Sequence, residues 1–135
     1  MPEAPLIAIV DDDKSIRNAT QDLLKAAGFS TATFEDGESF LYWANRTNAA
    51  CLVTDMRMPR MTGLELYRAL AATGQHIPTV IITAHPEELT QARARYAGIT
   101  FYLIKPFAPD ELLDCVRAAL TKSQARLATP SSQAL

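Results

Sequence analysis

The stretch Leu52-Val53-Thr54-Asp55-Met56-Arg57-Met58-Pro59 decides the fold, because it predicts a buried strand that ends by presenting a carboxylate. Its first residues are apolar and suit a strand, whereas residues 56–62 contain a proline and follow no hydrophobic period. Asp55 is therefore expected at the carboxyl end of the strand, where open parallel sheets bind their ligands. On this stretch alone, such an aspartate is more often a helix cap or a solvated loop residue than a reactive group.

Length and composition indicate one compact domain. The chain has 135 residues, of which 48% are hydrophobic and 21% charged, with a formal net charge of −2. Its Lys and Arg residues are scattered singly, so no nucleic-acid surface is expected. No apolar run is long enough to cross a bilayer, and no secretion signal opens the sequence, so a cytoplasmic location is expected. Cys51 and Cys115 are predicted to be buried free thiols, and His76 and His85 lack zinc-ligand spacing.

Five apolar runs predict strands, and helical periodicity follows each of them. The strands are expected over residues 6–10, 29–34, 51–55, 79–83 and 99–104. The helices are expected from residue 13 to Gly28, ending near Asn45, from Gly63 to Gly74, from Pro86 to Gly98, and over 107–122. The fourth of these helices is only weakly amphipathic, so it should be loosely held.

This alternation predicts an α/β domain with a parallel sheet and right-handed crossovers. For five strands and five helices, the flavodoxin-like doubly wound sheet with strand order 2-1-3-4-5 is the leading choice. The domain is expected to cover residues 1–122. Residues 123–135 are rich in Ser, Thr, Gln, Ala and Pro and lack an apolar face, so they are predicted to be a flexible tail or the start of a linker.

Chemically useful side chains follow the predicted strands at their carboxyl ends. They are Asp11, Asp12 and Asp13 after the first strand, Asp55 on the third, Thr83 on the fourth and Lys105 after the fifth. Several carboxylates in one crevice need a cation, and hard oxygen ligands suit Mg²⁺. A hydroxyl and an ammonium opposite them suit a phosphate. Because the sequence has no Gly-rich phosphate loop, a carboxylate that accepts phosphoryl is the favoured chemistry.

Four motifs together resemble the receiver domain of two-component response regulators, over residues 6–120. They are Val10-Asp11-Asp12, Thr54-Asp55-Met56-Arg57-Met58-Pro59 with Gly63 following, Ile82-Thr83-Ala84, and Lys105-Pro106-Phe107. The sequence around Asp55 and Lys105 is most similar to receivers of the nitrogen-fixation regulator type. Those receivers usually precede a helix-turn-helix DNA-binding domain, and no such domain is recognisable in these 135 residues.

The resemblance assigns roles around the acidic cluster. It makes Asp55 the phosphoacceptor, and it implies that Asp12, Asp55 and the backbone carbonyl of Arg57 bind Mg²⁺. Asp11 is expected to act mainly through a metal-bound water. Asp13 matches a position that is often acidic but is not usually a ligand, and a helix cap is an equally good interpretation.

The resemblance also implies a switch. Thr83 is expected to hydrogen-bond one phosphoryl oxygen, and Lys105 is expected to pair with another. A cis Lys105–Pro106 peptide bond is expected to aim the lysine into the crevice. The Tyr102 ring is expected to turn inward when Thr83 moves. Without the resemblance, Tyr102 would be an ordinary half-buried strand aromatic. His85 could touch the phosphate rim, although a solvated loop histidine is the better interpretation.

Three functions compete. The leading one is a signalling switch that takes phosphoryl from a sensor histidine kinase or a phosphotransfer protein and catalyses only its own modification. Such a switch could act on transcription through a DNA-binding domain, or it could be a stand-alone receiver or a phosphorelay shuttle. After phosphorylation, the surface made by the fourth helix, the fifth strand and the last helix could mediate formation of a homodimer. An aspartyl-phosphate phosphatase would need an acid where Arg57 stands. A degenerate receiver would lack Asp55, Lys105 or the acid pair, and all are present.

Overall fold

A five-stranded parallel sheet forms the centre of the computed structural model, which describes residues 4–43, 48–87, 90, 99 and 101–128. The strand order is β2-β1-β3-β4-β5, and every neighbouring pair is parallel, as the sequence predicted. The strands are β1 (Leu6–Val10), β2 (Ser30–Phe34), β3 (Cys51–Asp55), β4 (Thr79–Thr83) and β5 (Phe101–Ile104). The chain reverses its direction of winding between β2 and β3, which places a crevice between β1 and β3.

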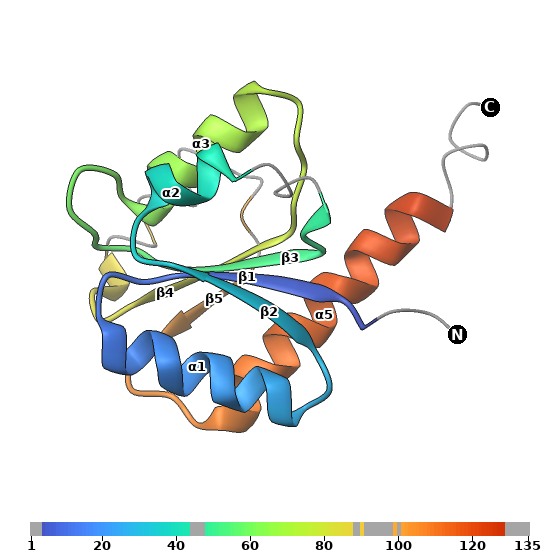
Figure 1. The fold of residues 1–135 in the computed structure, drawn as a ribbon, viewed down its shortest axis with the longest axis horizontal. Coiled ribbons are helices and arrows are strands. Elements are labelled where there is room, and N and C mark those ends of the chain that lie inside the picture. Colours follow the sequence, from blue (N-terminus) through green and yellow to red (C-terminus); the bar gives the residue numbers. More distant parts are fainter. Residues whose placement is uncertain (1–3, 44–47, 88–89, 91–98, 100, 129–135) are drawn as a thin grey trace.

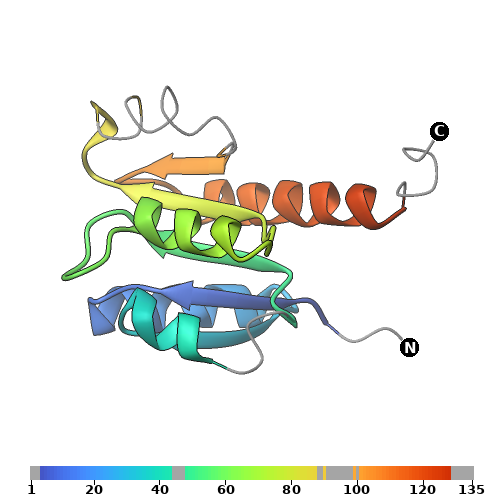
Figure 2. The ribbon, with the colours of Figure 1, turned by 90° about the horizontal axis from the view of Figure 1, so that it is seen from above.

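Helices cover both faces of the sheet. Figure 1 shows α1 (Lys14–Ala26) and α5 (Pro109–Ala128) on one face, and α2 (Gly37–Tyr42) and α3 (Gly63–Ala72) on the other. The view from above shows the helices running alongside the strands (Figure 2). Within the described residues, no helix is long and apolar enough to cross a membrane.

The period of two along the strands divides the core between these faces. In β1, Ile7 and Ile9 pack with Leu24 of α1 and with the inner side of α5, whereas Ala8 and Val10 pack with α2 and α3. Nearly every residue of β1, β3 and β4 is buried because both sides of these strands are covered. The continuous apolar runs in the sequence have this origin.

Several predicted boundaries differ from the structure. The strands β2 and β5 begin at Ser30 and Phe101, one and two residues later than predicted, and α2 ends at Tyr42. Most of the predicted fourth helix lies outside the described residues, as does the tail beyond residue 128, so the count of five helices stays a prediction.

The last helix departs most from its prediction, because α5 extends to Ala128 instead of ending at residue 122. Residues 123–128 have the sequence SQARLA, in which Gln, Ala, Arg and Leu are good helix formers. Helical propensity therefore carries the helix past the point where its apolar face stops. The domain boundary at residue 122 remains a prediction.

Candidate functional site

The carboxyl ends of four strands meet at one edge of the sheet. The register pairs Val10 with Thr54, and it pairs Asp55 with Ile82 on the next strand. On the far side, Thr83 pairs with Ile104. The residues at or just after these positions are Asp11, Asp55, Thr83 and Lys105, which the parallel topology thus brings together.

Three carboxylates form an acidic cluster at this edge. Asp11, Asp12 and Asp55 each offer an oxygen atom, and these atoms lie within 4.8 Å of one another. Asp11 is only 5% exposed, whereas Asp12 is exposed. The backbone N–H of Asp13 donates to Asp11 Oδ1 (2.9 Å), and the Arg17 guanidinium donates to the Asp11 carbonyl (2.6 Å). Oxygen donors at this spacing fit a hard divalent cation with room for waters, such as Mg²⁺.

Burial opposes ionisation in the cluster. Loss of solvation raises the pKa of Asp11 from 3.8 to about 6. The hydrogen bond from the Asp13 N–H lowers this pKa, whereas the nearby Asp55 charge raises it further. Loss of solvation also raises the pKa of Asp55, although the Lys105 ammonium acts in the opposite direction. The negative charge is therefore incompletely balanced by the chain itself, which is the electrostatic condition for binding a cation.

Lys105 reaches into the crevice from the far side. Its Nζ lies 3.3 Å from Asp55 Oδ1, and both side chains are mostly buried. The Lys105 backbone N–H donates to the Thr83 carbonyl (2.8 Å), and the Lys105–Pro106 peptide bond is cis, as predicted. An ammonium in contact with one oxygen of Asp55 is placed to meet an anion bound there.

Thr83 is buried at the end of β4 with its hydroxyl tied to the following loop. The His85 backbone N–H donates to Thr83 Oγ1 at 2.9 Å. That bond uses a lone pair of the oxygen and leaves the hydroxyl hydrogen as a donor for an anion in the crevice. The His85 ring stands at the rim, with Nδ1 3.8 Å from a carboxylate oxygen of Glu87.

The loop after Asp55 depends on Gly63. The Met56 N–H donates to the Ile82 carbonyl (2.8 Å), and the Gly63 N–H donates to the Met56 carbonyl (2.9 Å). A Cβ atom at Gly63 would lie 2.5 Å from the Asp55 carbonyl oxygen and 3.1 Å from Thr54 Cγ2. Sequence analysis placed Gly63 at the start of a helix and in the motif that follows Asp55, and the structure shows why the residue is glycine: its lack of a side chain lets the backbone close behind Asp55.

The remaining predicted residues lie around this centre. Asp13 caps α1, because its carboxylate accepts from the Ile16 N–H at 3.1 Å, and it is not among the three clustered carboxylates. Arg57 has an exposed side chain in the loop after β3. Tyr102 is half-buried and packs against a small core of Met56, Ile81 and Ile99.

Sequence analysis missed Arg60. Its Nε donates to Glu38 Oε1 (2.7 Å) and its Nη2 donates to Asp36 Oδ2 (2.8 Å), so it joins the loop after β3 to the start of α2. It also lines a hollow of about 210 Å³ together with Asp12, Glu35, Asp36 and Pro59. No local pattern signals this contact, because the partners lie more than twenty residues apart in the sequence.

The fold and the site define a class of protein. The family model for the response regulator receiver domain matches residues 7–117, and the chain belongs to this family, as the receiver domain of a two-component response regulator. Receiver domains of response regulators are phosphorylated by histidine kinases and use Mg²⁺ in their acidic pocket.

Individual relatives agree with this assignment. The chain is 38% identical to the response regulator protein TodT of Pseudomonas putida, over 87% of this chain and 52% of TodT. It is 32% identical to the transcriptional regulatory protein FixJ of Azorhizobium caulinodans, over 91% of this chain and 58% of FixJ. The chain therefore spans about half the length of these curated relatives.

Solved structures give the same result. The response regulator StyR matches with a TM-score of 0.84 and 40% identity, over 96% of this chain and 66% of StyR. The structure named FixJ-N matches with a TM-score of 0.78 and 32% identity, over 90% of this chain and 96% of that one.

Proposed function

We propose that the chain is a phosphorylation-dependent switch in which Asp55 accepts a phosphoryl group from a phosphohistidine. The donor is a sensor histidine kinase or a histidine phosphotransfer protein, and the proposal places the reaction in the cytoplasm. The observation that carries it is the meeting of Asp11, Asp12 and Asp55 within 4.8 Å, with Lys105 Nζ 3.3 Å from Asp55.

The chain's own residues divide the work of phosphoryl transfer. An oxygen of Asp55 attacks the phosphorus, the bond from phosphorus to the histidine nitrogen breaks, and an acyl phosphate forms. Lys105 meets one phosphoryl oxygen and the Thr83 hydroxyl donates to another. Asp12, Asp55 and the Arg57 carbonyl would hold Mg²⁺, with Asp11 acting through a bound water, and the ion supplies positive charge beside the transferred group.

Arg57 supports a switch over a hydrolase. A phosphatase that uses an aspartyl phosphate needs an acid or base to handle the proton of the attacking water. The position two residues after Asp55 carries a permanently charged guanidinium, which cannot take up that proton. Asp55 phosphate is therefore expected to outlive the transfer step and to serve as a signal.

We infer that the signal passes to transcription through a DNA-binding domain outside these residues. This rests on FixJ, a transcriptional regulatory protein by name, and on the half-length match to it. The alternative is a stand-alone receiver or a phosphorelay shuttle. Continuation of the reading frame beyond Leu135 into a helix-turn-helix sequence supports the first, and a stop codon there supports the second.

Intact-mass spectrometry after incubation with acetyl phosphate tests the phosphoacceptor. The wild-type protein should gain one phosphoryl group with Mg²⁺ and lose that ability in excess chelator. Asp55→Asn should gain none, because the amide is not a nucleophile, and the matched change Asp22→Asn, on the exposed side of α1, should behave as wild type. Equal uptake by Asp55→Asn, or full uptake without Mg²⁺, contradicts the proposal.

A further inference from the structure

The loop that follows Asp55 has an inner and an outer attachment. The inner one is Met58, which is buried and whose sulfur lies 4.0 Å from Thr54 Oγ1. The outer one is Arg60, whose guanidinium donates to Asp36 and Glu38 of another connection. Arg57 comes directly before Met58 and three residues before Arg60, so its carbonyl lies in the short loop that both attachments hold.

One of the two carboxylates that accept from Arg60 is also held by the start of α2. Asp36 is the N-cap of α2, with Oδ1 accepting from the Ser39 N–H at 2.7 Å, so only its Oδ2 faces Arg60. Glu38 lies in the first turn of the same helix. A planar guanidinium that bonds two carboxylates, one of them already held by a cap, loses less side-chain entropy per bond than an isolated surface pair does.

The backbone of Arg60 has an unusual conformation that needs a physical explanation. Its φ is +68°, and it is the only non-glycine with positive φ among the described residues. A side chain in the left-handed region is strained, and such strain persists where surrounding contacts impose it. The next residue, Met61, packs closely over Gly37, where a Cβ would lie 2.8 Å from its sulfur.

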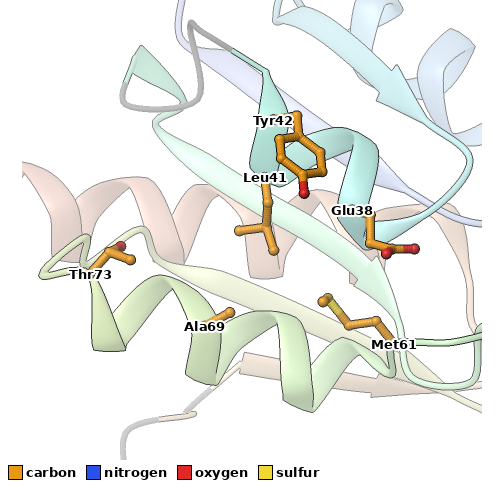
Figure 3. Close-up of a pocket in the computed structure, with 6 residues that line it drawn as sticks. All are labelled: Glu38, Leu41, Tyr42, Met61, Ala69 and Thr73. Atoms are coloured by element: carbon orange, nitrogen blue, oxygen red, sulfur yellow. The ribbon is translucent and has the colours of Figure 1, made fainter.

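Figure 3 shows the groove between α2 and α3, with Glu38 and Met61 at the same end of it. The groove has a volume of about 350 Å³ and is also lined by Leu41, Tyr42, Ala69 and Thr73. The loop after β3 is thus attached to α2 by an ion pair and by an apolar contact that are adjacent to each other.

We propose that Arg60 is a positioning residue that, by clamping the loop after β3 to Asp36 and Glu38, sets the affinity of the acidic cluster for Mg²⁺ and the lifetime of Asp55 phosphate. This inference rests on the proposed function. The clamp acts through the loop backbone at Arg57, whose carbonyl would be a ligand of the metal.

Whether removal of Arg60 weakens or tightens Mg²⁺ binding distinguishes a clamp from an effect of its charge alone. Arg60 lines the same hollow as Asp12, so its positive charge repels a cation in the cluster. If charge alone mattered, removal of Arg60 would tighten Mg²⁺ binding. If the clamp matters, removal loosens the loop and weakens binding.

Titration calorimetry with Mg²⁺ at low ionic strength makes the test. Asn is the substitution of choice, since it tolerates positive φ while removing the guanidinium. Arg60→Asn should weaken Mg²⁺ binding about two- to fivefold, the range that exposed ion pairs supply. Lys25→Asn removes the same charge at the opposite edge of the sheet, and Gly28→Ala strains the backbone there (φ +99°); both should bind as wild type does.

Three further measurements distinguish the clamp from general destabilisation. Glu38→Gln should weaken binding in the same direction, and the double variant should be no weaker than Arg60→Asn alone, because the partners act as one unit. The difference from wild type should close at about 1 M salt, where the Debye length is about 3 Å. The lifetime of Asp55 phosphate, followed by intact mass, should change with Mg²⁺ affinity across the series.

Failure of the clamp and failure of the proposed function give different experimental results. Unchanged or tighter Mg²⁺ binding by Arg60→Asn, in a protein whose thermal unfolding shows it to be folded, overturns the clamp. Failure of the wild-type protein to take up phosphoryl at Asp55 overturns the proposed function, whatever the Mg²⁺ titrations give.

Discussion

Asp11 has the lowest solvent exposure of the three clustered carboxylates, and its burial has a cost that depends on pH. Its pKa of about 6 in the folded protein stands above its ordinary value of 3.8. At a pH between these two pKa values, Asp11 is protonated in the folded state and ionised in the unfolded state. The stability that this proton provides is therefore complete below about pH 4 and is lost as the pH rises through about 6. Asp36 has a lowered pKa, and its opposite effect falls below that window.

The metal-free protein should therefore lose about 1–3 kcal/mol of unfolding free energy between about pH 4 and pH 7. Asp11→Asn should reduce this slope, since an amide does not titrate, while the raised pKa of Asp55 keeps the remainder. Urea unfolding in chelator across this range measures it, with Asp22→Asn as the control for a lost surface carboxylate. Mg²⁺ should restore stability at neutral pH because it binds only the folded state. Parallel curves for wild type and Asp11→Asn would show that Asp11 ionises without penalty.

The predictable part of the site lies at the strand ends, and the rest depends on loop geometry. Asp55, Thr83 and Lys105 could be predicted from sequence because parallel strands deliver their last residues to one edge. Arg60 could not, because its partners come from another connection and its φ of +68° follows no residue preference. The need for glycine at 63 likewise became visible only from the position of the Asp55 carbonyl.

At the scale of elements, the strands were predictable because burial on both faces leaves continuous apolar runs. Helix faces were less so. The spacing of Ile16, Ala19 and Leu24 places them on one face of α1, yet Ile16 is 38% exposed and Ala19 is exposed, whereas Leu24 is fully buried. Sequence period reports which residues align on a helix, and not how much of that face the rest of the molecule covers.

The first turn of α1 separates a capping role from a metal role. Asp13 accepts from the Ile16 N–H, and its own N–H donates to Asp11. Asp13→Ala keeps the N–H and removes the cap, so it should lower the unfolding free energy by about 1 kcal/mol. Phosphoryl uptake from acetyl phosphate at saturating Mg²⁺ should stay at the wild-type level. Chemical unfolding and intact mass measure the two effects, and a loss of uptake without a loss of stability would make Asp13 part of the metal site instead.

At the scale of the whole molecule, the site connects to the edge of the sheet through β4 and β5. Asp55 is paired in register with Ile82 of β4. The Lys105 backbone N–H donates to the Thr83 carbonyl, so a shift of Thr83 also moves the residue that follows β5. Tyr102 pairs in register with Ile81 and packs with Met56, directly after Asp55. These contacts join the phosphoacceptor to the β5 edge, where Ile104 is 45% exposed.

This connection leads to a prediction about assembly. When a phosphoryl oxygen draws the Thr83 hydroxyl inward, space opens beside β5 for the Tyr102 ring, and the surface made by the fourth helix, β5 and α5 changes shape. Three arginines belong to the elements of this surface: Arg93 and Arg95, in the predicted fourth helix, lie outside the described residues, and Arg117 is exposed on α5. We expect this surface to become a self-association face, so the protein should pass from monomer to dimer when beryllofluoride, a phosphoryl mimic, occupies the site.

Sedimentation velocity with and without beryllofluoride and Mg²⁺ measures this transition. Asp55→Asn should stay monomeric, because the mimic needs the carboxylate. Arg117→Glu should still bind beryllofluoride but fail to dimerise, since the reversed charge lies on the interface and not in the crevice, and Lys25→Glu, at the end of α1, is its matched control. Amide exchange should slow across β5 and α5 in the dimer. Unchanged mass and unchanged exchange in the wild-type protein saturated with the mimic would confine the effect of phosphorylation to the crevice, and the surface would then be an ordinary solvated face.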